Sequence, residues 1–297
     1  HVGSQFIFMA VRRPDGYVGK PPTVASDVFS MNTGNATAES DDKPTFVSGF
    51  PVDFALRRMP TGGSGTDMDW VVYNRLNGGK YLRTNTADTE AQSSRAKWDL
   101  MTGFNHTDNN TYQAWMFKRH AGMDVISDIG DGQTTKVIAH SLGVVPQMIW
   151  RKNRDNGDNW QVYHFGVNSG TNPHLYRLRL NTNNMEDTDS YTWVNAPTAT
   201  HFTVGSNGSI NRANEDFLNV LFASVDGISK VGTYNGSSST QTITCGFRPR
   251  FFWQKRVSGT GEWHTCDTLR GWGPGNDQFM YLDGSNGQSG YDFGEPT

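Results

Sequence analysis

Cysteine and charge are both scarce in this sequence. Its 297 residues include two cysteines, Cys245 and Cys266, and 19% of the residues are charged. Two cysteines are too few for a disulfide framework or for a zinc site built on four such ligands. We expect both to be buried free thiols, and a disulfide between neighbouring strands is the alternative.

Long apolar runs and basic blocks are also missing. No stretch approaches the roughly 18 apolar residues that cross a bilayer. The net charge is −3, and no basic cluster offers the positive footprint of a nucleic-acid groove. The sequence thus predicts neither membrane insertion nor nucleic-acid binding. Nothing near His1 resembles a signal peptide. The segment "SQFIFMAVRR" has the pattern of a strand, and it begins almost at the first residue. We therefore expect a longer parent chain.

Glycine and aromatic residues are abundant instead. The 33 glycines favour tight turns, and the 12% of aromatic residues suit the half-buried faces of sheets. Helix signals are few, and "EAQSSRAKWDLM" from Glu90 is the clearest candidate for one or two helical turns. The sequence predicts an all-β fold of tandem hairpin or sandwich modules, with helix below about a tenth of the residues.

One sequence pattern occurs three times, about 95 to 103 residues apart. Each copy has a proline, an apolar run that ends in Arg or Lys, a Gly-rich turn and a tryptophan. The prolines are Pro51, Pro146 and Pro249, and the tryptophans are Trp70, Trp160 and Trp263. Strand, turn and returning strand is the pattern of a β-hairpin. We expect the three tryptophans to be buried core residues at equivalent places, rather than rings that stack on a ligand.

A second element recurs as "IFMAVRR", "AWMFKR" and "VLFAS", with Phe8, Phe117 and Phe222 at matching positions. The chain then divides into the back half of a module (1–48), two complete modules (49–144 and 145–246) and a front half (247–297). Strands left single at both ends would be exposed edges. The front half could complete the opening back half, or a missing upstream segment could pair instead.

The sequence carries no recognisable catalytic, cofactor-binding or metal-binding motif. His140, His164 and His264 lie near repeat elements but in different registers. The acidic turns at Asp128 and Asp155 lack the closing Glu of a calcium loop and read as turn chemistry. A glycosidase needs two carboxylates across a cleft. Spacing cannot pair distant acids, and the candidates for such a pair are Glu90, Asp187 and Glu215. We predict no catalytic residue, no cofactor and no metal.

The ordered string "AWMFKR…DVI…VIAHSLGVVPQMIWRK…NWQVYH" resembles a repeat of structural proteins from tailed marine bacteriophages. The matching residues are Phe117, Lys118, Arg119, Gly122, Asp124, Val125, His140, Leu142, Gly143, Pro146, Met148, Trp160, Tyr163 and His164. The departures are "HAGM" where the family prefers "APGF", and Cys266 where it has Tyr. They put in doubt that all copies do the same job.

This resemblance implies a virion protein, a tail fibre or tail-associated adhesin that contacts host-surface glycan. It also implies other virion proteins as partners and assembly as a homotrimer. The alternatives are a non-adhesive decoration protein of capsid or tail and a carbohydrate-active enzyme.

Overall fold

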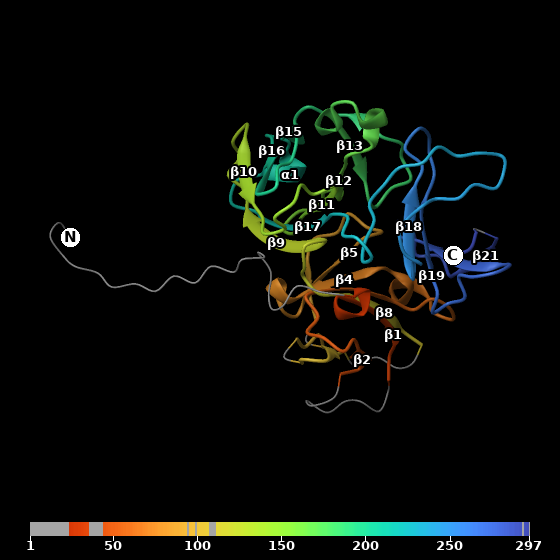
Figure 1. Cartoon of the computed structure of the whole chain (residues 1–297). Helices are drawn as coiled ribbons and strands as arrows, with labels where there is room; N and C mark the ends of the chain where they lie inside the picture. Colours follow the sequence, from red (N-terminus) through yellow and green to blue (C-terminus); the bar gives the residue numbers. More distant parts are fainter. Residues whose placement is uncertain are drawn as a thin grey trace.

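Two six-stranded antiparallel sheets dominate the computed structural model, which describes residues 24–35, 44–93, 95–98, 100–106, 111–292 and 294–296 (Figure 1). The first sheet has the order β1 (Phe29–Thr33), β8 (Gln113–Phe117), β3 (Phe54–Arg58), β4 (Val71–Asn74), β5 (Lys80–Arg83) and β6 (Ala91–Gln92). The second has the order β9 (Met123–Ile129), β17 (Asp216–Phe222), β11 (Met148–Asn153), β12 (Gln161–His164), β13 (Tyr176–Arg179) and β14 (Asp187–Thr188).

A third, four-stranded sheet repeats part of this order near the C-terminus. It consists of β18 (Phe251–Lys255), β19 (Trp263–Asp267), β20 (Asp277–Tyr281) and β21 (Ser289–Tyr291). Its strands correspond to β3–β6 of the first sheet and to β11–β14 of the second. In all three sheets the first two of these strands form a predicted hairpin.

Two small sheets lie outside the large ones. One pairs β2 (Phe46–Val47) with β7 (Gly103–Phe104), and the other contains β10 (Lys136–Ala139), β16 (His201–Val204) and β15 (Trp193–Asn195). Among the described residues, α-helix is confined to α1 (Gly208–Asn211). Short 3-10 turns complete the elements: η1 (Ala25–Asp27), η2 (Gly65–Met68), η3 (Arg75–Asn77), η4 (Val167–Gly170) and η5 (Pro173–Leu175).

The all-β expectation is confirmed. The helical turns expected from Glu90 are wrong, because β6 lies there and pairs with β5. Glu90 itself is held by its backbone N–H, which donates to the carbonyl of Arg154 (2.7 Å). Phe8 and most of the predicted 1–48 unit lie outside the described residues, and the module boundaries stay a prediction.

The central strands of the two six-stranded sheets are buried on both faces: β3, β4, β8, β11, β12 and β17. Side chains alternate along β11: Met148 and Trp150 enter a central core, whereas Ile149 enters an outer core under the β10–β16–β15 sheet. The first sheet behaves in the same way, since Leu56 faces the central core and Ala55 faces the outer one.

Two strands pair with the sheet that is built on the hairpin following them in the chain. β1 precedes the first hairpin and pairs with β8, and β9 follows β8 in sequence but pairs with β17 of the second sheet. Residues of all three large sheets therefore share the central core. Figure 1 shows the second sheet above the first, with the third beside both.

The three hairpin tryptophans connect the sheets in a cycle. The indole Nε1–H of Trp70 donates to the carbonyl of Tyr281 in the third sheet (2.7 Å). That of Trp160 donates to Arg83 of the first sheet (2.7 Å), and that of Trp263 to Arg179 of the second (2.9 Å). The exposed fractions of Trp70, Trp160 and Trp263 are 0%, 0% and 2%. All three are thus core residues.

We expect the Trp160→Phe substitution to destabilise the fold although it keeps a ring in the core. It leaves the buried Arg83 carbonyl without its donor, at a cost of about 1–3 kcal/mol in the free energy of unfolding. Trp160→Ala also opens a cavity and should cost about 3–5 kcal/mol.

Urea denaturation followed by circular dichroism measures both variants. The control is Trp272→Phe, which removes a surface hydrogen bond from the indole to the Gly294 carbonyl (2.7 Å). It should change the free energy by less than about 0.5 kcal/mol. Equal effects of Trp160→Phe and Trp272→Phe would contradict a structural role for the cycle.

Candidate functional site

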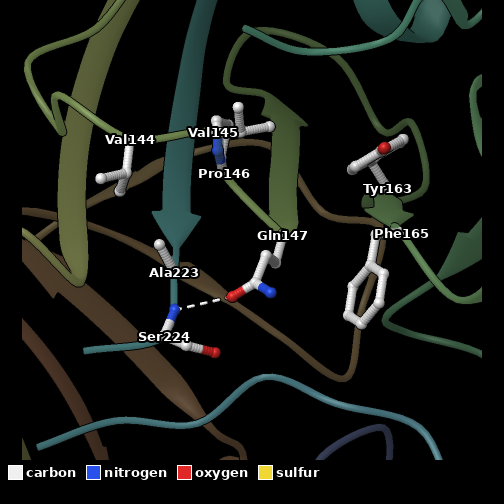
Figure 2. Close-up of a pocket in the computed structure, with 8 residues that line it drawn as sticks. All are labelled: Val144, Val145, Pro146, Gln147, Tyr163, Phe165, Ala223 and Ser224. Carbon is white, nitrogen blue, oxygen red and sulfur yellow. Dashed lines mark hydrogen bonds between the residues drawn. The ribbon is translucent and has the colours of Figure 1, made fainter. Parts of the chain in front are cut away.

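A pocket of about 410 Å³ opens where β11 begins and β17 ends (Figure 2). Its lining is mostly apolar and consists of Val144, Val145, Pro146, Gln147, Tyr163, Phe165, Ala223 and Ser224. Val144 and Val145 are 41% and 49% exposed, which is high for branched apolar side chains. Exposed apolar groups around a hollow are a common feature of binding sites.

Gln147 supplies the central polar group of this pocket. Its backbone N–H donates to Phe222 (2.8 Å), and its carbonyl accepts from the N–H of Phe165 (2.9 Å). Its side-chain Oε1 accepts from the N–H of Ser224 (2.7 Å), as Figure 2 shows. These bonds hold the amide in place at the rim.

The other polar groups of the pocket suit binding better than reaction. Burial raises the pKa of Tyr163 to about 12, so its hydroxyl stays neutral. The Ser224 hydroxyl donates to the Val231 carbonyl (3.3 Å) and accepts from the Val231 N–H (3.0 Å). These partners are backbone groups, whereas an activated nucleophile hydrogen-bonds a general base.

Each of the three acids that were candidates for a catalytic pair is bonded to a different partner. Glu90 forms a bidentate pair with Arg154 (2.8 and 2.7 Å). Asp187 bonds Arg177 and Arg179 (2.9 Å each). Glu215 accepts from Asn153 (2.5 Å) and from Asn156. Asp187 joins strands β14 and β13, whereas Glu90 and Glu215 bond residues at the end of β11 and in the turn after it. These carboxyls therefore connect neighbouring segments of the fold.

The histidines and acidic turns are likewise held by neighbouring groups. Burial lowers the pKa of His164 to about 4, and its Nδ1 accepts from the N–H of Gly166 (3.0 Å). Burial also lowers the pKa values of His140 and His264. Asp128 lies on strand β9 rather than in the turn expected for it, and it pairs with Arg151 (2.5 Å). Asp155 accepts from the Asp216 N–H (2.6 Å).

Metal ligands and thiols offer no further site within the described ranges. No group of three or more His, Cys, Asp or Glu side chains there is placed to hold a metal ion. Both cysteines are free thiols. Cys266 is buried, which raises its pKa to about 12, whereas Cys245 is partly exposed, contrary to the expectation that it is buried. No helix in the described part is long and apolar enough to cross a membrane.

A pair of carboxyls distinguishes the third sheet from the other two. In each sheet the backbone N–H of the hairpin tryptophan donates to a side-chain oxygen. That oxygen belongs to Asn85 (3.0 Å) in the first sheet, Asn181 (3.0 Å) in the second and Asp283 (2.9 Å) in the third. The two asparagines also donate, to Asp69 (2.7 Å) and Asn159 (2.8 Å).

At the corresponding place Asp283 has the carboxyl of Glu262 as its neighbour. Burial is the largest cause that raises the pKa of Asp283 to about 7, and the interaction with the Glu262 carboxyl is the next. Lys255 lies close enough to be affected by both carboxylates. Asp283 therefore keeps its proton up to a higher pH than an exposed carboxyl does.

The structure places the predicted repeat residues as follows. Pro51, Pro146 and Pro249 each precede the first strand of a hairpin and lie apart. Phe117 packs against the central core, and Phe222 belongs to it. The pocket was missed, although the exposed valine pair after Gly143 could have indicated it. The carboxyl pair was missed too, and alignment of the copies would have set Asp283 against two asparagines.

The chain thus combines a three-sheet β-body with a small apolar pocket on its second unit. Residues 102–289 match the model of a domain of unknown function (DUF7483), which is more than half of the chain. The chain therefore belongs to that family. Neither a curated protein nor a solved structure matches it.

The Asp283→Asn substitution should make the fold more stable at high pH. A carboxyl whose pKa is raised by folding stabilises most below its unfolded pKa near 4, and this contribution is lost as the pH rises through about 7. The variant should match the wild type near pH 4 and exceed it at pH 8.5 by on the order of 2–4 kcal/mol.

Thermal unfolding between pH 4 and 8.5 checks this. The reverse variant, Asn85→Asp beside Asp69, should introduce the same pH dependence into the first sheet. An Asp283→Asn protein with the wild-type pH profile would contradict the raised pKa of Asp283.

Proposed function

We propose that this chain is a structural protein of a bacteriophage virion, a tail fibre or tail-associated adhesin that contacts host-surface glycan. The resemblance of its repeat to virion proteins motivates the proposal. The observation that supports it best is the cycle of indole hydrogen bonds, which joins three sheets around one core. Such a body resists deformation, as a protein that transmits force at a particle surface must.

The pocket beside Gln147 is the proposed glycan contact. A pyranose ring has apolar C–H faces and polar hydroxyl edges. Val145 and Phe165 offer apolar surface, and the fixed amide of Gln147 offers a hydrogen-bonding group at the same rim. The carboxyls of Glu90 and Asp187 form ion pairs with arginines, and that of Glu215 accepts a hydrogen bond from an asparagine amide. Carboxyls engaged in this way favour binding over hydrolysis.

A decoration protein is the second candidate. The three hairpins already close on one another within a single chain, so the body needs no second copy to bury its tryptophans. A self-contained module of this kind suits a subunit that caps a capsid or tail surface.

Binding to purified host polysaccharide tests the glycan contact. We expect Val145→Asp to weaken binding at least about tenfold, because it sets a charge against the apolar part of the pocket. The control is Val137→Asp, at a position on β10 that is 61% exposed and outside the pocket lining. Biolayer interferometry measures both variants. Equal binding by both would remove the pocket from the proposal, and shortening of the polymer would favour an enzyme.

Light scattering on the full-length protein tests the assembly. We expect a trimer, since fibre-like virion proteins with repeated modules commonly assemble around a threefold axis. The low charge and the many aromatic residues keep the desolvation cost of burying surface between subunits small. A strictly monomeric particle at micromolar concentration would rule out the trimer and leave the decoration protein.

A further inference from the structure

The third sheet differs from the other two at one edge. β3 lies between β8 and β4, and β11 lies between β17 and β12. β18, the corresponding strand, pairs with β19 on one side and with no second strand among the described residues. Every residue of β3 and β11 is buried, whereas all five residues of β18 are only partly buried, although three of them are aromatic.

Residues 230–249 show the complementary feature. They follow β17, as β9 follows β8, yet no backbone–backbone hydrogen bond joins them to any other described residue. A run of this length without such bonds is unusual in a folded chain. Val231 nevertheless packs against the central core, as Val125 of β9 does. This segment is thus placed like an outer strand that lacks its inner neighbour.

A side-chain contact indicates how wide the gap is. In the second sheet Arg151 of β11 reaches Asp128 of β9 (2.5 Å) across the intervening β17. At the corresponding positions the Tyr234 hydroxyl donates to Gln254 of β18. The same kind of contact therefore bridges β18 and the 231–235 segment, with room for one strand between them. Figure 1 shows residues of this region, in cyan, beside β18.

We propose that the gap between β18 and residues 231–235 is a slot for one strand, filled by Gln5–Ala10 of the same chain. These residues, "QFIFMA", lie outside the described ones and form the third copy of the β8 and β17 sequence. β8 sets Phe117 opposite Phe54, and β17 sets Phe222 opposite Met148. The same register sets Phe8 opposite Phe251, with the Phe6 and Phe8 side chains in the central core.

The position of β1 favours the same chain as the donor. Phe29, the first residue of β1, stacks on Phe251 with ring centroids 5.6 Å apart. A chain that leaves the slot at Ala10 has 18 residues in which to reach Val28, which can span up to about 60 Å. It would then enter the first sheet, as β9 enters the second. The slot is independent of the proposed virion role.

A pair of engineered cysteines tests the register. Gln5 corresponds to Asn219, which lies opposite Arg151, so Gln5 should lie opposite Gln254. Facing residues of paired strands are close enough for a disulfide. In a Cys245→Ser background, oxidation of Gln5→Cys/Gln254→Cys should give an intramolecular cross-link. The matched control is Gln5→Cys/Gln278→Cys on β20, two strands farther along the sheet, which should give none.

Non-reducing electrophoresis and mass spectrometry read the outcome. Cross-linking of both pairs alike, or of neither pair in a folded protein, overturns the proposal. Disulfide-linked dimers overturn closure by the same chain and assign the slot to a second copy.

Hydrogen exchange on the full chain gives an independent readout. Amides in Gln5–Ala10, β18 and residues 231–235 should exchange at least about tenfold faster in Phe8→Asp than in the wild type, while β11 stays protected. Wild-type amides in Gln5–Ala10 that exchange as fast as an unfolded chain would contradict the slot.

Discussion

The hydrogen bond from a buried indole N–H to the carbonyl of a neighbouring sheet organises the molecule. An indole N–H in a dry core needs an acceptor, and a strand carbonyl that points into the core needs a donor. Each large sheet supplies one of each, and in the second sheet Trp160 donates to Arg83 while Arg179 accepts from Trp263. Each sheet therefore provides the acceptor for an indole N–H of another sheet. The three sheets therefore depend on one another for a complete core.

The cycle explains why the large sheets have two apolar faces. One face meets the other sheets around the tryptophans, and the other meets an outer layer such as β10–β16–β15. Ion pairs add further links: Asp187 joins β14 to β13, and Glu90 holds Arg154 in the turn after β11. The pocket beside Gln147 lies at such a rim, at the end of a rigid strand. A binding group is well placed there because the scaffold holds its position.

The copies are similar in their cores and differ at their edges and tips. Asp283 stands where the other copies have asparagine, and this replacement sets a carboxyl with a raised pKa beside Glu262 in place of an amide. The side of β18 that has no second strand among the described residues is another difference. Repetition accounts for the stability of the body. Where the copies differ in sequence or in strand pairing, one copy has a group or an edge that the others lack.

The sequence by itself determined the β-hairpins and the burial of their tryptophans. Alternation, glycine turns and the fixed interval before Trp160 and Trp263 act over a few residues, so spacing alone reveals them. Local spacing failed at Glu90, where pairing of β6 with β5 overrode a weak helical signal. Only the tertiary structure decided that Trp160 reaches Arg83, that Asp283 meets Glu262, and that Gln147 and Ser224 share one pocket. Those contacts join segments that are distant along the chain. Their distances follow from how the sheets pack around the central core, which no local pattern encodes.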